Sequence, residues 1–166
     1  MCIRDSTYAA ASAPVGALFA IMTKVGVYAV LRVTTLVFGA EVAAPFLSLL
    51  ALATLALAAV GALAATRLRG LVAYLVVASA GTLLLAAGLG SEGTLAAGLF
   101  YLINSTLVAA AWFLLADRIA AARGGSDLLQ PRPLGGGWAL PGAAFFVAAV
   151  AMAGRPPLAG FMGKAP

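Results

Sequence analysis

Long apolar runs, separated by short polar connections, dominate this chain. Four of them cover residues 14–38, 45–66, 71–89 and 94–116, and a fifth begins near 138 and continues toward 166. A helix needs about 20 apolar residues to cross a bilayer, and each of the first four runs is long enough. The pattern therefore predicts an all-α, polytopic transmembrane helix bundle with about five spans.

The fifth run contains a break near residues 155–157. Pro156 and Pro157 follow Arg155, and proline interrupts a helix because it lacks an N–H and clashes with the preceding turn. An apolar pattern with Gly160 in it then resumes up to Lys164. A discontinuous helix at membrane depth is tolerated only where it is buried in protein or lines a cavity. A loop at the end of the span is the alternative interpretation.

The amino-acid composition indicates that the chain is embedded in a membrane. Of its 166 residues, 64% are hydrophobic and only 9% are charged, whereas a soluble domain carries about 25% charged residues. The mean hydropathy is +1.10. The chain has no histidine and one cysteine, Cys2, so neither an intrachain disulfide nor a cysteine metal site is possible. We expect no cofactor, no metal and no enzymatic activity.

Charged residues alternate between the connections. The connection after the second run holds Arg67 and Arg69, and the one after the fourth run holds Arg118, Arg123 and Arg132. The connections after the first and third runs each hold one acid, Glu41 and Glu92. The positive-inside rule assigns the basic connections to the cytoplasm, so the first run points outward. Arg32, near the outer end of that run, opposes this rule and must snorkel or pair. The net charge is +5, but the basic residues do not form a patch interleaved with aromatic residues, so we expect no nucleic-acid partner.

Lys24 lies about ten residues into the first run. At ~1.5 Å per residue this is roughly 15 Å deep, the midplane of a hydrocarbon core about 30 Å thick. A lysine there costs ~2.5–3.5 kcal/mol on insertion scales and normally faces a bundle interior or a wet cavity. Burial favours the neutral amine, so such a lysine can accept and release a proton. The four runs offer no carboxylate at this depth as its counter-ion.

Other polar residues share this depth. They are Ser79 and Thr82 on the third run and Asn104, Ser105 and Thr106 on the fourth, with Tyr101 three residues before Asn104. A polar layer on three helices that includes a lysine predicts the lining of a hydrated proton path. Polar residues that only hold helices together are the alternative. Small residues such as the row Ala56, Val60 and Ala64 suggest close helix packing, and the alternative is that alanine and glycine only reflect a GC-rich genome.

Four segments carry a family resemblance. Residues 14–32, 71–82, 101–107 and 153–164 resemble successive helices of the antiporter-like subunits of respiratory complex I and of multisubunit cation/proton antiporters. The chain is most similar to the D subunits of the Mrp/Pha-type antiporters, which exchange Na⁺ or K⁺ for protons. The resemblance covers nearly the whole chain after Ser6.

The resemblance implies roles for particular positions. Lys24 matches the central lysine of the proton path, and Lys164 matches the ionisable residue after the helix break. Asn104 and Ala80 stand where relatives carry histidines, so water held by the polar layer would have to bridge the gap. The implied partners are other subunits of a multisubunit complex, protons, Na⁺ or K⁺, and the lipid of a bacterial cytoplasmic (inner) membrane.

Several interpretations remain open on sequence alone. The first is a proton-translocating subunit of a Na⁺(K⁺)/H⁺ antiporter, and the second is a proton-pumping subunit of complex I or a related hydrogenase, which would be a redox-linked translocase. A non-conducting structural subunit is the third. Residues 1–6 resemble an adapter or assembly scar, and residues 7–166 resemble a fragment of one antiporter-like transmembrane domain, its later half.

Overall fold

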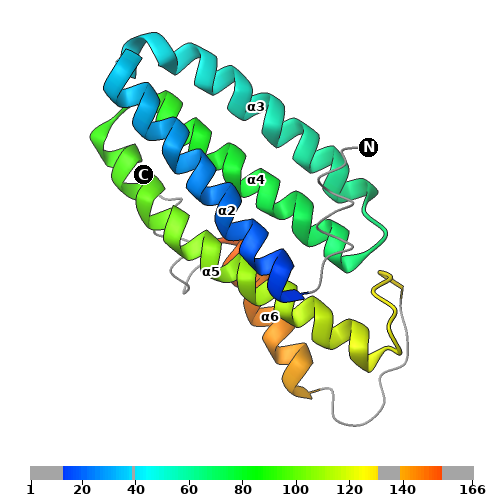
Figure 1. Cartoon of the computed structure of the whole chain (residues 1–166). Coiled ribbons are helices and arrows are strands. Elements are labelled where there is room, and N and C mark those ends of the chain that lie inside the picture. Colours follow the sequence, from blue (N-terminus) through cyan, green and yellow to red (C-terminus); the bar gives the residue numbers. More distant parts are fainter. Residues whose placement is uncertain (1–12, 39, 131–138, 155–166) are drawn as a thin grey trace.

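The computed structural model describes residues 13–38, 40–130 and 139–154, and these form helices joined by short connections (Figure 1). In chain order the elements are α2 (Ala13–Val33), the π-helix η1 (Thr34–Phe38), α3 (Ala40–Ala64), α4 (Leu68–Leu89), α5 (Glu92–Ala122) and α6 (Ala139–Ala153). By length and composition α2, α3, α4 and α5 can each cross a membrane, and α6 is a shorter apolar helix. The chain is thus an all-α, multi-pass membrane bundle.

The helix bounds follow the apolar runs to within three residues, with two larger differences. Helix α3 begins at Ala40, five residues before the predicted start, and carries Pro45 inside it. Helix α5 continues to Ala122, beyond the predicted end at 116, where Ile119 and Ala120 are buried and Asp117 pairs with Arg69 of α4. Helix α6 ends at Ala153, and Gly154 has a φ of +69°. The predicted break at 155–157 lies beyond the described residues.

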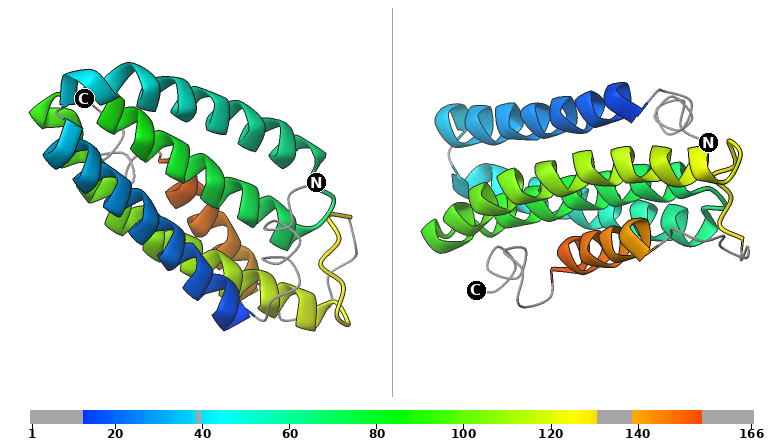
Figure 2. Two further views of the ribbon diagram at one scale, coloured as in Figure 1. Left: turned by 45° about the horizontal axis from the view of Figure 1, so that its top comes forward. Right: turned by 90° about the horizontal axis from the view of Figure 1, so that it is seen from below.

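Helix α4 lies at the centre of the bundle. It contacts α3, α5 and α2, whereas α3 packs on α4 and η1, and α6 packs on α5. Figure 2 shows α2 and α6 on opposite sides of α5. Gly90, with a φ of +67°, ends α4, and the Ser91 side chain accepts a hydrogen bond from Thr94 N to start α5. The up-and-down order places the ends of α4 and α5 that carry arginines at the same end of the bundle.

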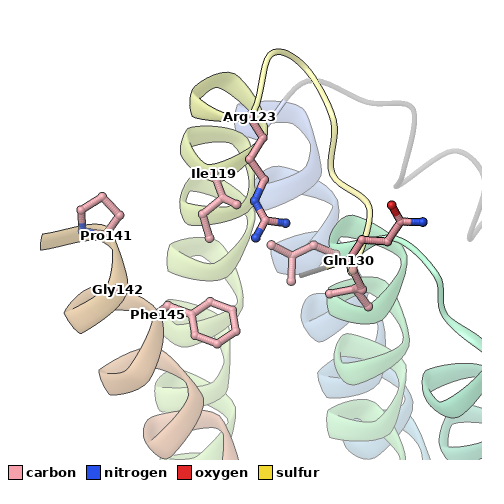
Figure 3. A pocket seen from close by; sticks show the side chains of 8 residues that line it. Ile119, Arg123, Gln130, Pro141, Gly142 and Phe145 are labelled. Atoms are coloured by element: carbon pink, nitrogen blue, oxygen red, sulfur yellow. The ribbon is translucent and has the colours of Figure 1, made fainter. Parts of the chain in front are cut away.

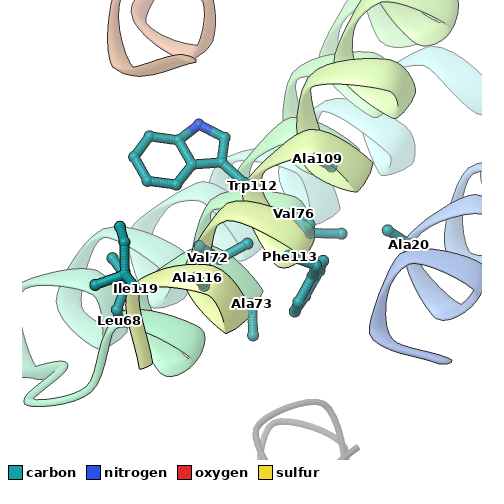
Figure 4. Close-up of a cluster of buried hydrophobic side chains, with 10 residues drawn as sticks. All are labelled: Ala20, Leu68, Val72, Ala73, Val76, Ala109, Trp112, Phe113, Ala116 and Ile119. Atoms are coloured by element: carbon teal, nitrogen blue, oxygen red, sulfur yellow. The ribbon is translucent and has the colours of Figure 1, made fainter. Parts of the chain in front are cut away.

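The apolar core lies between α2, α4 and α5 (Figure 4). Trp112 and Phe113 leave α5 on different sides, Phe113 toward α2 and Trp112 toward α6. Trp112 Nε1 donates to Ala148 O at 3.2 Å, and its ring meets Phe145 edge-on at 5.0 Å between centroids. These two residues therefore join the flanking helices to α5.

Helices α3 and α4 approach closely at glycines. A Cβ atom on Gly81 would lie 2.9 Å from Leu55 Cγ, and one on Gly88 would lie 3.0 Å from Ser48 N. The small-residue row that we predicted for this purpose, Ala56, Val60 and Ala64, is exposed instead. The row therefore takes no part in the α3–α4 contact, and because α3 is apolar all round, its sequence does not indicate which side packs on α4.

Large apolar side chains cover much of the outer surface of the bundle. Leu36, Leu57 and Leu63 are 72%, 73% and 90% exposed. An apolar surface of this extent requires lipid or further protein around it.

Candidate functional site

Lys24 is buried near the middle of α2. Its side chain is only 2% exposed, and it lies one helical turn after Ala20 and two after Gly16, on the buried face of that helix. The ammonium Nζ donates a hydrogen bond to Ser79 Oγ of α4. Within the described part of the chain Lys24 makes no ion pair. The amine therefore faces the bundle interior, with a hydroxyl as its polar partner.

Ser79 occupies the matching face of α4. It is 3% exposed and lies among the buried residues Val76, Ala80 and Leu83. Its Oγ donates to Val76 O at 2.7 Å while accepting from the lysine. A hydroxyl has one donor and two acceptor sites, so one side chain can serve both bonds.

Tyr101 and Thr82 complete the group. The Lys24 ammonium lies 5.8 Å from the centroid of the Tyr101 ring, within the range of a cation–π contact. The Tyr101 and Thr82 side chains are hydrogen-bonded to each other, and Thr82 Oγ1 donates to Ser79 O at 2.8 Å. We call Lys24, Ser79, Thr82 and Tyr101 the lysine cluster. It joins α2, α4 and α5 at one depth.

A groove runs beside the lysine between α2 and α5. Its volume is about 330 Å³, and it is lined by Ile21, Lys24, Val25 and Tyr28 of α2 and by Leu102, Ile103, Thr106 and Leu107 of α5. A second hollow of about 190 Å³ shares Tyr28 and Leu102 with it and extends to Arg32. The two hollows follow one another along the α2–α5 seam, from the lysine toward the end of α2 that carries Arg32.

The remaining predicted residues of α5 make no hydrogen bond with the amine within the described residues. Ser105 is buried, and Ser105 Oγ and Thr106 Oγ1 both donate to Leu102 O, at 3.2 and 2.6 Å. Asn104 is half-buried and makes no hydrogen bond with Lys24. The structure thus brings together the four predicted residues of the lysine cluster, and Thr106 lines the groove beside it. Lys164, Arg155, Pro156, Pro157 and Gly160 lie outside the described residues.

Sequence reasoning missed a polar contact at the end of the bundle that carries most arginines. Arg69 Nη2 of α4 lies 2.5 Å from Asp117 Oδ1 of α5, and Arg67 lies 3.9 Å from Asp127 in the connection after α5. The backbone there forms a short antiparallel bridge between Arg67 and Leu128. We call this the basic end. One feature of the sequence indicated this contact, namely Asp117 directly after the fourth apolar run, but the sequence did not indicate that Arg69 is its partner.

No cluster of potential metal ligands occurs in the part of the chain that the structure describes. The chemistry available in the lysine cluster is therefore protonation of an amine, together with hydroxyl donors and acceptors and an aromatic face.

Comparisons with known proteins agree on one family. The family model described as "NADH:quinone oxidoreductase/Mrp antiporter, TM" matches residues 5–166. The D subunit of a probable K(+)/H(+) antiporter of Rhizobium meliloti is 38% identical over 96% of this chain and 34% of its own length. The D subunit of a Na(+)/H(+) antiporter of Bacillus subtilis is 34% identical over 95% of this chain and 33% of its own. The chain spans about a third of the length of these relatives.

Proposed function

The chain belongs to the transmembrane family shared by NADH:quinone oxidoreductases and Mrp antiporters, and on this premise we propose that it forms part of the D-type, proton-translocating subunit of a multisubunit Na⁺(K⁺)/H⁺ antiporter. Its membrane is a bacterial cytoplasmic membrane, since the relatives are bacterial. Its partners are the other subunits of that complex, and its cargo is protons and Na⁺ or K⁺. The relatives' names include both cations.

The observation that carries this proposal is the Lys24 amine, 2% exposed and hydrogen-bonded to another helix at mid-depth. An amine in the membrane interior is costly and is normally retained for function. Its partners here, the Ser79 hydroxyl and the Tyr101 ring, are both neutral. They stabilise an ammonium less strongly than a carboxylate would, so the amine can release its proton as well as take one up.

The proton route follows from the surroundings of the amine. Protons reach and leave Lys24 through water in the α2–α5 seam, which Tyr28 and Thr106 help to line. Water is needed because Asn104 and Ala80 offer no titratable group. We further propose Lys164, beyond the helix break that the sequence predicts at Arg155, Pro156, Pro157 and Gly160, as the next proton acceptor along the route. Residues 7–166 would then form the later part of one transmembrane domain.

The redox-driven alternative is a proton-pumping subunit of complex I. The family description covers both kinds of complex, whereas the relatives compared above are named as antiporter subunits, and this favours the antiporter. The same names favour a transporter subunit over an enzyme.

The test uses the full-length subunit in its complex, in inverted membrane vesicles. Lys24→Ala should lower cation-dependent proton efflux about a hundredfold or more, the scale on which a positioned proton-transfer group acts. Co-purification of the other subunits checks assembly. Thr54→Val is the matched control, since Thr54 Oγ1 bonds its own helix at Leu50 O, on α3. Normal efflux from an assembled Lys24→Ala complex would leave only a structural role for this chain.

A further inference from the structure

A hollow lies at the basic end (Figure 3), and none of its lining residues belongs to the lysine cluster. Its volume is about 320 Å³, at the lower end of the ~300–1,000 Å³ of typical ligand sites. Its walls are largely apolar and come from α4, α5 and α6: Leu68, Ile119, Pro141 and Phe145. Of its lining residues, Arg123 and Gln130 are polar, and the Arg123 guanidinium points toward the hollow. A ligand here needs an apolar part and a part that accepts hydrogen bonds.

Arg123 supplies the donors. It is the C-terminal cap residue of α5, and its Nη1 donates to Leu128 O at 3.1 Å, which fixes the side chain. Figure 3 shows the guanidinium between the end of α5 and the connection that carries Gln130. Its Nε is buried and donates to no acceptor in the described residues. A guanidinium has five N–H donors, so several remain for a ligand's oxygen atoms.

The charges around the hollow favour an anion. The carboxylates of Asp117 and Asp127 lie at this end, and they pair with Arg69 and Arg67. Neither of them pairs with Arg123 within the described residues. An anion at Arg123 therefore meets a guanidinium that makes no ion pair within the described residues.

The position of the hollow identifies the class of ligand. Arg123 directly follows the membrane-crossing segment Gly93–Ala122, so it lies at the level of the lipid headgroups. Ile119 lies three residues before the end of α5, and Phe145 lies six residues after the start of α6, so both lie deeper along their helices than Arg123 does. We propose that this hollow binds an anionic phospholipid, with its phosphodiester on Arg123 and an acyl chain against Ile119 and Phe145. Basic pockets between transmembrane helices recognise anionic headgroups in this way.

The lipid would also hold α6 in place. Among the described helices α6 packs on α5 alone, whereas the hollow is lined by α6 and by Leu68 of α4. A bound lipid bridges these two helices and adds apolar contact that the protein does not make by itself.

The test measures thermal stabilisation of the purified, detergent-solubilised complex that contains the full-length subunit. Phosphatidylglycerol should raise its unfolding temperature at lower concentration than phosphatidylcholine, and inorganic phosphate should have no effect. Equal effects of the two lipids, or full stabilisation by inorganic phosphate, would contradict an anionic lipid site.

Two variants then locate the site. Arg123→Gln removes the cation and should weaken the phosphatidylglycerol effect about tenfold, as expected for one charge-assisted contact. Gly142→Leu should weaken it as well by filling the hollow, and a Cβ atom on Gly142 meets nothing within 4 Å, so the fold should tolerate it. Arg118→Gln, an arginine outside the hollow, is the matched control and should behave as the parent. A parent-like lipid response in either folded hollow variant, or an equal loss in Arg118→Gln, would overturn the proposal.

Discussion

The cations at depth and at the basic end have different kinds of partner. Lys24, buried near the middle of α2, has a hydroxyl and an aromatic ring, whereas Arg69 at the basic end has the carboxylate of Asp117. The arginine pair is partly exposed and contributes at most about 1 kcal/mol. An ion pair at the depth of Lys24 would hold its proton much more firmly, because the surroundings screen charge less. Neutral partners at depth are therefore compatible with a residue that exchanges protons.

Ser79→Ala tests the contact between the amine and its neighbour. The change removes the acceptor of the Lys24 Nζ donor, and an unsatisfied buried donor costs about 1–3 kcal/mol. We expect a lower unfolding temperature of the complex and slower proton efflux. Thr54→Val, which removes a hydroxyl that bonds its own helix, should change neither quantity. A Ser79→Ala complex that matches its parent in both measurements would show that the Ser79 contact is dispensable.

Counting residues along the runs predicted the depth of the lysine and the polar residues near it, but not which of them face it. Consecutive positions on a helix are about 100° apart, so Asn104, Ser105 and Thr106 cannot all face one amine. Hydroxyls in helices also bond their own backbone, as Ser105 and Thr106 do at Leu102 O. From the sequence alone, each hydroxyl can either face the amine or bond its own helix, and only the packing between helices decides which.

At the scale of elements, the contact between α3 and α4 depends on the absence of side chains. A Cβ atom on Gly88 would lie 3.0 Å from Ser48 N and 3.2 Å from Ala44 O, both backbone atoms that cannot move aside singly. In lipid, where burial of apolar surface gives helices no reason to associate, such close approach supplies much of the packing energy.

Gly88→Val should therefore separate α3 from α4 and destabilise the subunit by about 1–3 kcal/mol. The unfolding temperature of the purified complex measures this change. Gly26→Ala is the matched control, because a Cβ atom on Gly26 meets nothing within 4 Å. If both variants unfolded at the temperature of the parent, the close approach at Gly88 would not be required.

The elements themselves were largely predictable, because a bilayer fixes the length of an apolar run that crosses it. Neighbouring helices follow from short connections, and the arginines after the second and fourth runs indicate one basic end. The packing side of α3 was not predictable, since the exposed and buried faces of a helix in lipid are equally apolar. The helix break at residues 155–157 stays a prediction.

At the scale of the whole molecule, the lysine cluster lies inside the bundle and the arginine pairs lie at one end of it. The α2–α5 seam connects the level of Lys24 with the level of Arg32 through hollows that share Tyr28 and Leu102. A proton path along this seam requires that water enter it, although its lining is mostly apolar. The relatives are about three times as long as this chain, so further helices could cover the groove without closing the seam.

The most direct test is therefore whether water reaches position 24 in the intact complex. Lys24→Cys and Met22→Cys are compared in a cysteine-free, full-length background, by reaction with a small, charged thiol reagent in membrane vesicles. Met22 is 67% exposed on the apolar outer face of α2, whereas Lys24 is 2% exposed. We predict faster reaction at position 24, because a hydrated seam admits the reagent and supports the thiolate. An inert thiol at position 24, or one no faster than at position 22, would contradict a proton path through this lysine.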